Sequence, residues 1–269
     1  MSRLPQMFID DVIDHVGDVR TLKACSLVCS QWSFRSRKRL FGRVELHSAK
    51  DLGCWCASIR PGSSGPSSFV ETLSLIDSYT PTSTYHPTPW LQPQILSDAG
   101  LHLQSFSGLR AIEIGGWNTS TVYVSSMLGY LGSSFENVTK LVLKDIFVDA
   151  STLAMFISYF PHLDDLSIST IRPPRTLDGS SDLYGHVDIV PTRPHGKFTA
   201  LKISSFRALG EIFKGIILLE PRFRVVNLEG VSSYNAWREF WPLIEACAES
   251  LEEFNICTSV TGTWTHLNL

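Results

Sequence analysis

The residues that could ligate a metal or attack a substrate form no recognisable motif in this sequence, and its eight histidines are scattered. The closest pair of cysteines is Cys54 and Cys56, and no second pair follows it at the spacing of a zinc finger. The six cysteines contain no Cys-x-x-Cys pair. In a reducing compartment they are expected to be free thiols, buried or half-buried, and we expect neither a metal site nor another cofactor.

Sequence motifs of the large enzyme families are also missing. The chain has no phosphate-binding loop of Walker type, no Gly-x-Ser-x-Gly elbow and no His-Glu-x-x-His motif. Gly115-Gly116 lacks the further glycines of a dinucleotide fingerprint, and no glycine-rich turn follows the first expected strand, which ends at Leu46. These absences predict a protein without catalytic residues; a hydrolase with an unrecognised site is the remaining enzymatic alternative.

The composition favours a folded protein of one or two domains. The chain has 269 residues, of which 43% are hydrophobic and 18% are charged. Its net charge of −3 provides no basic surface for a nucleic acid or an anionic membrane. It has no apolar run of membrane-spanning length and does not begin like a signal peptide. We therefore expect a cytoplasmic or nuclear protein, or one found in both places, with no nucleic-acid or membrane partner.

The first forty-odd residues predict a small helical module. One expected helix carries apolar residues at helical spacing, namely Phe8, Ile9, Val12, Ile13 and Val16. A second begins near Thr21 and carries a stripe of Leu22, Cys25, Cys29 and Trp32. Two short helices cannot bury this many apolar side chains, so a third element or a partner must cover the rest. The basic run at 35–39 is interpreted as the solvated face of a third helix, with a nuclear-import signal as the alternative.

From Phe41 onward one apolar pattern recurs: an apolar residue, a second three positions later and a third two positions after that. The eight units are Phe41/Val44/Leu46, Val70/Leu73/Leu75, Leu109/Ile112/Ile114, Val138/Leu141/Leu143, Leu163/Leu166/Ile168, Phe198/Leu201/Ile203, Phe223/Val226/Leu228 and Leu251/Phe254/Ile256. The alternating pair that ends each unit predicts a short strand whose apolar side chains point inward.

Helical patterns lie between several of these strands. They cover residues 124–131, 153–160, 209–216 and 234–248, and Pro242 is expected to kink or interrupt the last. The repetition of strand, turn and helix predicts an α/β fold with parallel strands joined by crossovers, in which each unit is covered by its neighbour. Two long proline-rich segments, 77–94 and 172–197, are expected to be loops.

The N-terminal pattern resembles an F-box over roughly residues 2–46. The resemblance is carried by Leu4-Pro5, Ile9, Ile13, the run Leu22-Lys23-Ala24-Cys25-Ser26-Leu27-Val28-Cys29, Trp32 and Leu40-Phe41. Many F-boxes have Glu two residues after the proline, where this chain has Met7. The resemblance implies a three-helix module that docks on the Skp-type adaptor of a cullin–RING (SCF) ubiquitin ligase. The structural alternative is a helical hairpin that only packs on the rest of the chain.

The recurring unit resembles an irregular leucine-rich repeat, of the kind that follows F-boxes in many fungal proteins. The family's Asn or Cys, three positions after the third apolar residue, is missing. Those positions hold Ser78, Trp117, Ile146, Ile171, Phe206, Val231 and Ser259. The resemblance implies two domains, an F-box module at 1–46 and a strand–helix solenoid at 47–269. The apolar last residues predict that the solenoid is incomplete at its C-terminus or covered there by a partner.

By resemblance, the chain is expected to be the substrate-recognition subunit of an SCF ubiquitin ligase. Its expected partners are a Skp-type adaptor, through it a cullin–RING ligase, and an unknown target protein. The residues expected to bind the adaptor, some of which must also hold the module together, are Leu4, Pro5, Ile9, Ile13, Leu22, Val28 and Trp32. The alternative is an interaction scaffold with the same fold that acts outside any ligase.

Target binding is expected on the concave face of the sheet, because every second side chain of a strand points away from the core. The residues expected there are Glu113, Lys140, Lys144, Asp165, Lys202, Glu229 and Glu253. Their mixed charges favour a protein or peptide partner over a polyanion. Two alternatives stay open: these residues are simply a solvated surface, or the two proline-rich loops recognise the target.

Overall fold

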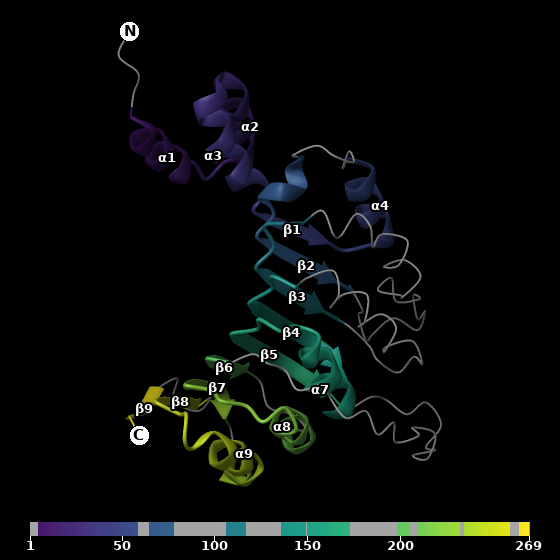
Figure 1. Cartoon of the computed structure of the whole chain (residues 1–269), viewed down its shortest axis with the longest axis vertical. Coiled ribbons are helices and arrows are strands. Elements are labelled where there is room, and N and C mark those ends of the chain that lie inside the picture. Colours follow the sequence, from purple (N-terminus) through teal and green to yellow (C-terminus); the bar gives the residue numbers. More distant parts are fainter. Residues whose placement is uncertain are drawn as a thin grey trace.

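A three-helix module leads into one long sheet, with helices along one side of that sheet (Figure 1). The computed structural model describes residues 5–58, 65–77, 106–116, 136–148, 150–172, 198–204, 209–231, 234–258 and 264–268. The helix predicted at 124–131 and nearly all of both proline-rich segments lie outside these described residues. The fold class predicted from the sequence, α/β with parallel strands, is confirmed.

The N-terminal module consists of α1 (Gln6–Asp14), α2 (Val19–Val28) and α3 (Ser30–Phe41). Asp18 caps α2, since its carboxylate accepts the Thr21 backbone N–H at 2.7 Å. The three helices share a small apolar cluster in which Ile9, Ile13 and Leu22 are buried. Because this cluster is so small, the module buries only one narrow stripe of each helix.

Nine strands form the sheet in the order of the sequence. They are β1 (Arg43–Leu46), β2 (Thr72–Ile76), β3 (Ala111–Gly115), β4 (Lys140–Phe147), β5 (Asp165–Arg172), β6 (Ala200–Ser204), β7 (Val225–Val231), β8 (Glu253–Thr258) and β9 (Trp264–Asn268). The first eight pair in parallel, and β9 pairs antiparallel with β8. The predicted module boundary at residue 46 therefore falls at the end of β1, a strand that already belongs to the sheet.

The register of the strands aligns the predicted apolar units with one another. One row of aligned residues is Val44, Leu73, Ile112, Leu141, Leu166, Leu201, Val226 and Phe254. The second row, two positions later in each strand, is Leu46, Leu75, Ile114, Leu143, Ile168, Ile203, Leu228 and Ile256. Every member of both rows is buried. The inward orientation predicted for all eight units is confirmed, and each such side chain contributes about 1.5–3 kcal/mol through burial.

A backbone ladder joins the units at the start of each strand. The carbonyl of Gly42 accepts the N–H groups of both Glu71 and Thr72, each at 2.9 Å. The same arrangement, one carbonyl that accepts two successive N–H groups of the next unit, recurs at Glu71, Arg110, Thr139, Asp164, Thr199 and Arg224. Each unit is thus fixed to its neighbour before the strand itself begins.

The helices outside the module cover the apolar rows. They are α4 (Ala49–Ser58), α7 (Ala150–Ser158), α8 (Leu209–Ile217) and α9 (Tyr234–Cys247), whereas the 3₁₀-helix η1 (Pro66–Phe69) packs on α3. The helices predicted at 153–160, 209–216 and 234–248 are confirmed, and α9 continues through Pro242 as one helix. Helix α4 was not predicted, although Ser48 and Asp51 form a reciprocal N-terminal cap: Ser48 Oγ accepts the Asp51 N–H, and Asp51 accepts the His47 N–H.

Residues with a left-handed backbone conformation (positive φ) recur at one level of the sheet, two positions after the second inward apolar residue of a strand. Gly116, Asp145, Thr170 and Gly230 have φ angles of 70°, 48°, 55° and 81°. The register places the residues before them, Gly115, Lys144, Ser169 and Glu229, at one level across the sheet. A Cβ atom at Gly116 would lie 1.9 Å from the Asp77 carbonyl oxygen. A repeated left-handed turn therefore stands close to where the family pattern has its asparagine.

The two ends of the parallel sheet are covered by different elements. At the first edge, α3 and η1 lie beside β1. At the other edge, β9 pairs with β8 from Glu253↔Asn268 to Cys257↔Trp264. The apolar C-terminal segment, which the sequence predicted to need a further chain or a partner, thus supplies a strand that covers the edge of β8. None of the helices in the described ranges combines the length and apolar character that a membrane crossing requires.

The first testable prediction concerns Thr170, a β-branched residue in the left-handed region. That conformation costs a non-glycine residue roughly 1–2 kcal/mol, whereas glycine adds about 0.5–1 kcal/mol of backbone entropy to lose on folding. Thr170→Gly is therefore expected to raise the free energy of unfolding by about 0.5–1 kcal/mol, measured by urea denaturation. The control is Ser169→Gly, at the neighbouring position with ordinary φ, which should destabilise. Equal destabilisation by both variants would contradict the prediction.

Candidate protein-interaction surfaces

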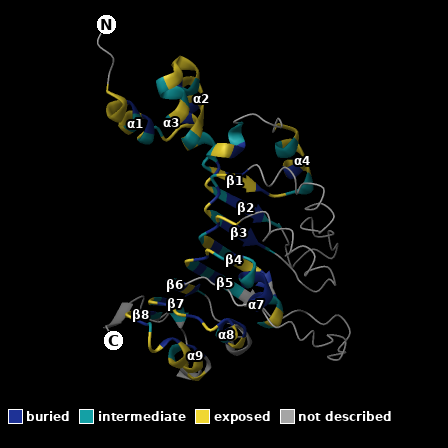
Figure 2. Cartoon of the chain, viewed as in Figure 1, coloured by how far each residue is buried: buried dark blue, intermediate teal, exposed yellow. Residues whose placement is uncertain are grey.

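Large exposed apolar side chains are concentrated in the N-terminal module. Among the described residues nine such side chains are exposed, and seven of them lie in α1–α3. The seven are Met7, Phe8, Val12, Val19, Leu27, Val28 and Phe34. Figure 2 shows the same contrast, with exposed residues prominent on the module and buried residues along the strands. Exposed apolar groups gathered in this way make the module the candidate interaction surface among the described residues.

The geometry of α1 explains why three of its five apolar residues are exposed. Ile9 and Ile13, 3% and 0% exposed, point into the module. Phe8 and Val12 precede them by one position each, about 100° around the helix, and are 56% and 53% exposed. The sequence pattern placed all four in one apolar set, whereas the small core accommodates only one of the two stripes.

Three residues predicted to bind the adaptor are structural. Ile9, Ile13 and Leu22 form the buried cluster of the module, with exposed fractions of 5% or less. Side chains buried to this degree cannot contact a partner unless the module opens. Their assignment to the adaptor-binding surface is corrected to the role of holding the three helices together, which the sequence could not separate from binding.

The other predicted adaptor residues differ in exposure. Pro5 is exposed at the start of α1, and Leu4 lies outside the described residues. Val28 is 63% exposed at the end of α2. Trp32 is half-buried against the cluster of Ile9 and its neighbours. Only Pro5 and Val28 of the described set are therefore fully available to a partner.

Several exposed residues of the module were not predicted as binding residues. They are Met7, Phe8, Val12, Val19, Leu27 and Phe34. The sequence of this region contains more apolar residues than short helices can bury, which indicates a binding surface. This excess does not show which of the apolar residues are exposed. Leu27, at 83%, has the largest exposed fraction of the group.

The basic run of α3 is engaged within the molecule. Arg35 forms a two-point contact with the Asp14 carboxylate, one arm of which is an Nε–Oδ1 bond of 2.7 Å. This hydrogen bond, with the charge of Arg35, lowers the pKa of Asp14. Arg39 donates to the Val16 carbonyl. The run was predicted to be the solvated face of a third helix. It does lie on α3, where Arg37 and Arg39 are exposed, whereas Arg35 and Lys38 are half-buried in ion pairs.

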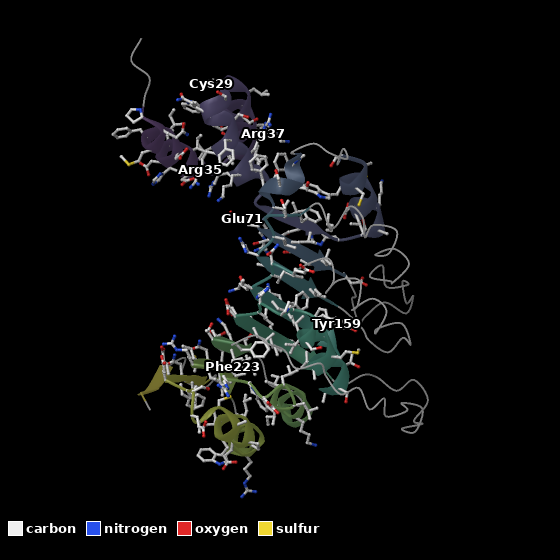
Figure 3. The ribbon with its side chains drawn as sticks, viewed as in Figure 1. Cys29, Arg35, Arg37, Glu71, Tyr159 and Phe223 are labelled. Carbon is white, nitrogen blue, oxygen red and sulfur yellow. The ribbon has the colours of Figure 1, made fainter. Side chains whose placement is uncertain are left out.

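Helix α3 joins the module to the sheet through three kinds of contact. Lys38 Nζ lies 2.7 Å from Glu71 Oε1, and Figure 3 places Glu71 directly below the module, at the start of the sheet. The rings of Phe34 and Phe69 meet edge to face, with centroids 5.5 Å apart. Gly42 follows α3 directly; a Cβ atom there would lie 2.6 Å from the Lys38 carbonyl oxygen. The connection is therefore short and packed.

Glu113 is the buried centre of an ionic network on the face of the sheet opposite the apolar rows, and its two cationic partners, Arg43 and Lys144, are about half exposed. Its side chain is 7% exposed. One carboxylate oxygen accepts from Lys144 Nζ at 2.5 Å; the other accepts from Arg43 at 3.0 Å and from Ser74 Oγ at 3.2 Å. Burial raises the pKa of Glu113, but the hydrogen bonds and positive charges of these partners outweigh it and lower the pKa below its ordinary value.

The remaining residues predicted to bind a target are paired along the same face. Lys140 contacts Asp165 at 2.5 Å, and Lys202 contacts Glu229 at 2.7 Å. Glu253 accepts from the amide of Asn255 at 2.5 Å. With Lys144 bound to Glu113, every lysine predicted for this surface has an acidic partner inside the molecule. A ligand on this face would meet lysines that are already paired with carboxylates, whereas Glu253 keeps its negative charge beside a neutral amide. Glu113 itself is corrected from a target contact to a buried anchor of its neighbours.

The candidate metal ligands are separate in the structure. Cys54 is exposed and Cys56 is half-buried, and desolvation raises the pKa of the Cys56 thiol. Within the described ranges no group of three or more His, Cys, Asp or Glu residues is arranged to hold a metal ion.

No protein-family model matches this chain, and no curated protein sequence matches it.

The second prediction concerns Glu113. Glu113→Gln is expected to lower the free energy of unfolding by about 1–3 kcal/mol at pH 7, because a buried anion with two cationic partners is lost. The folded-state pKa of Glu113 lies below its ordinary value of 4.5. The extra free energy of unfolding that the wild type has over Glu113→Gln is therefore fully present above pH 4.5. It is lost as the pH falls through the folded-state pKa of Glu113. Urea denaturation of both proteins between pH 7 and pH 3 measures this difference.

The matched control for Glu113→Gln is Glu45→Gln. Glu45 also pairs with Arg43, at 2.8 Å, but both side chains are about half exposed. Solvent screening limits such a pair to less than about 1 kcal/mol. Equal losses in the two variants, or a Glu113 effect that grows at low pH, would contradict the role assigned to the network.

Proposed function

We propose that this chain is the substrate-recognition subunit of an SCF-type cullin–RING ubiquitin ligase. In this proposal α1–α3 are an F-box that binds a Skp-type adaptor, and the sheet with its helices is an irregular leucine-rich-repeat domain that binds a target protein. The observation that carries the proposal is the concentration of exposed apolar side chains in α1–α3, seven of nine among the described residues. The sequence resemblance names the partner that would cover them.

The second domain supports the proposal through its regularity. Eight parallel strands repeat one register and one backbone connection, as stacked repeats do. Such solenoids present a long continuous surface, which suits the capture of another protein. The charges on the open face are paired internally, so recognition there would rest on shape, hydrogen bonds and exchange of ion-pair partners rather than on a net charge.

The mechanism is proximity, and the chain contributes no catalytic group of its own. The adaptor would hold the module, the sheet would hold the target, and a ubiquitin-conjugating enzyme recruited elsewhere would meet a target lysine at high effective concentration. The short packed connection between α3 and β1 would keep the two binding surfaces in a defined relation. The competing function, a scaffold outside any ligase, uses the same fold but requires no adaptor.

The third prediction tests the adaptor surface at two exposed positions. Phe8→Ser and Leu27→Ser should each weaken binding to a purified Skp-type adaptor by about tenfold or more, because truncated apolar anchors of an interface commonly cost 1–2 kcal/mol or more. Isothermal titration calorimetry measures the affinity, and circular dichroism shows that the helices remain folded.

The control for this test is Leu218→Ser. Leu218 follows α8 and is 58% exposed, so the same change is made at a leucine that is also exposed but lies outside the module. Its affinity for the adaptor should equal that of the wild type. If the wild-type chain does not bind the adaptor, the scaffold function replaces the ligase function. If it binds and both module variants bind as tightly, the adaptor site is elsewhere.

A further inference from the structure

Helix α2 presents a second stripe to solvent, opposite the residues that it buries. Val19, Lys23 and Leu27 follow one another at steps of four, and Arg20 lies beside them at a step of three before Lys23. All four are exposed, with Val19 54% and Leu27 83% exposed. We call these four residues the α2 stripe. It combines apolar side chains with two cations on one face of a ten-residue helix.

The two cations of the α2 stripe are unpaired. Among the residues that the structure describes, neither Arg20 nor Lys23 has an acidic partner, whereas Arg35, Lys38 and Arg43 all do. Asp18, the nearest acid in sequence, is turned toward Thr21, whose N–H and hydroxyl both donate to it at 2.7 Å. The stripe therefore carries uncompensated positive charge on a chain whose net charge is −3.

The exposed face of α1 has the opposite charge. Phe8 and Val12 lie one turn apart on one flank, Asp11 lies beside Phe8 at a step of three, and the Asp11 side chain is 74% exposed. Its contact with His15, at 3.7 Å, is an ion pair only when the imidazole is protonated. The module thus has an acidic apolar face on α1 and a basic apolar face on α2. Such a division of charge fixes the orientation of a bound protein, because each face repels the wrong side of the partner.

We infer that the α2 stripe docks on an acidic protein surface with an apolar centre, and that this surface belongs to the adaptor. The apolar centre would receive Leu27, and surrounding carboxylates would face Arg20 and Lys23. This inference rests on the proposed function and adds to it the chemistry of the partner's surface and the helix that meets it. Electrostatic complementarity of this kind acts chiefly on the association rate and on its dependence on salt.

The test compares variants that change the charge of the α2 stripe and leave its apolar residues in place. Arg20→Glu/Lys23→Glu should lower the association rate constant for a purified Skp-type adaptor by about tenfold or more in 50 mM salt. The difference from the wild type should shrink in 500 mM salt, because the screening length falls to a few ångströms. Arg20→Gln/Lys23→Gln should give an intermediate rate. Stopped-flow fluorescence measures these rates, and thermal denaturation shows that each variant is folded.

The matched control is Lys50→Glu/Arg110→Glu. These two cations are exposed on α4 and before β3, and the double change alters the net charge by the same amount. Its association rate should stay near the wild-type value, apart from a small effect of net charge. If the control slows association as much as the stripe variant does, net charge and not the α2 stripe attracts the adaptor, and the inference fails.

Two further outcomes separate this inference from the proposed function. If the wild type binds the adaptor and Arg20→Glu/Lys23→Glu associates at the same rate, the inference fails while the proposed function stands. If the wild type does not bind the adaptor, both fail. The third arm uses vesicles with about 30% anionic lipid, which a basic apolar helix face can also bind. Binding to these vesicles that the double reversal abolishes, with no effect on the adaptor rate, assigns the stripe to a membrane surface and overturns the inference.

Discussion

The register of the parallel strands is the constraint on which the sheet depends. A shift by one residue in any strand would turn both of its inward apolar side chains to the open face. Two features hold the register together: the apolar rows behind the strands, and the carbonyl before each strand that accepts two N–H groups of the next unit. Both depend on only a few residues per unit. The segments between strands can therefore vary in length without disturbing the pairing.

The surfaces of the module and of the sheet differ in whether their side chains find partners within the chain. On the open face of the sheet, polar groups are satisfied within the molecule, as Glu113 shows with its three donors. The cost of burying that carboxylate is offset by partners of the same chain. In the module, apolar groups such as Leu27 remain in water, although the chain has a large core elsewhere. Apolar surface that stays in water in the isolated chain yields the most free energy when a partner covers it. We therefore base the proposed function on the surface of the module.

The fold was largely predictable from the sequence because each strand carries its own apolar pair, and Leu141 and Leu143 are typical. The helix at α4 was missed although its sequence offers two signals: a cap formed by Ser48 and Asp51, and apolar residues at helical spacing that include Leu52 and Trp55. The candidate site was less predictable. Periodicity shows that Phe8 and Ile9 are both apolar, but only three-dimensional packing decides which faces the core. Likewise, the pairing of Glu113 with Arg43 spans seventy positions and leaves no local signal.

Because each unit adds one strand to the sheet, the distance along the sheet grows by a fixed step from one unit to the next. Neighbouring strands are about 4.8 Å apart, so the seven steps from β1 to β8 span about 34 Å. Since Gly42 alone separates α3 from β1, the first strand of the sheet is held next to the module. Measured along the sheet, β7 lies about 19 Å beyond β3, so a protein seated over β7 would be held farther along the sheet from the module than one seated over β3. The position of contact along the strands would then decide which part of a bound protein lies within reach of whatever the module holds.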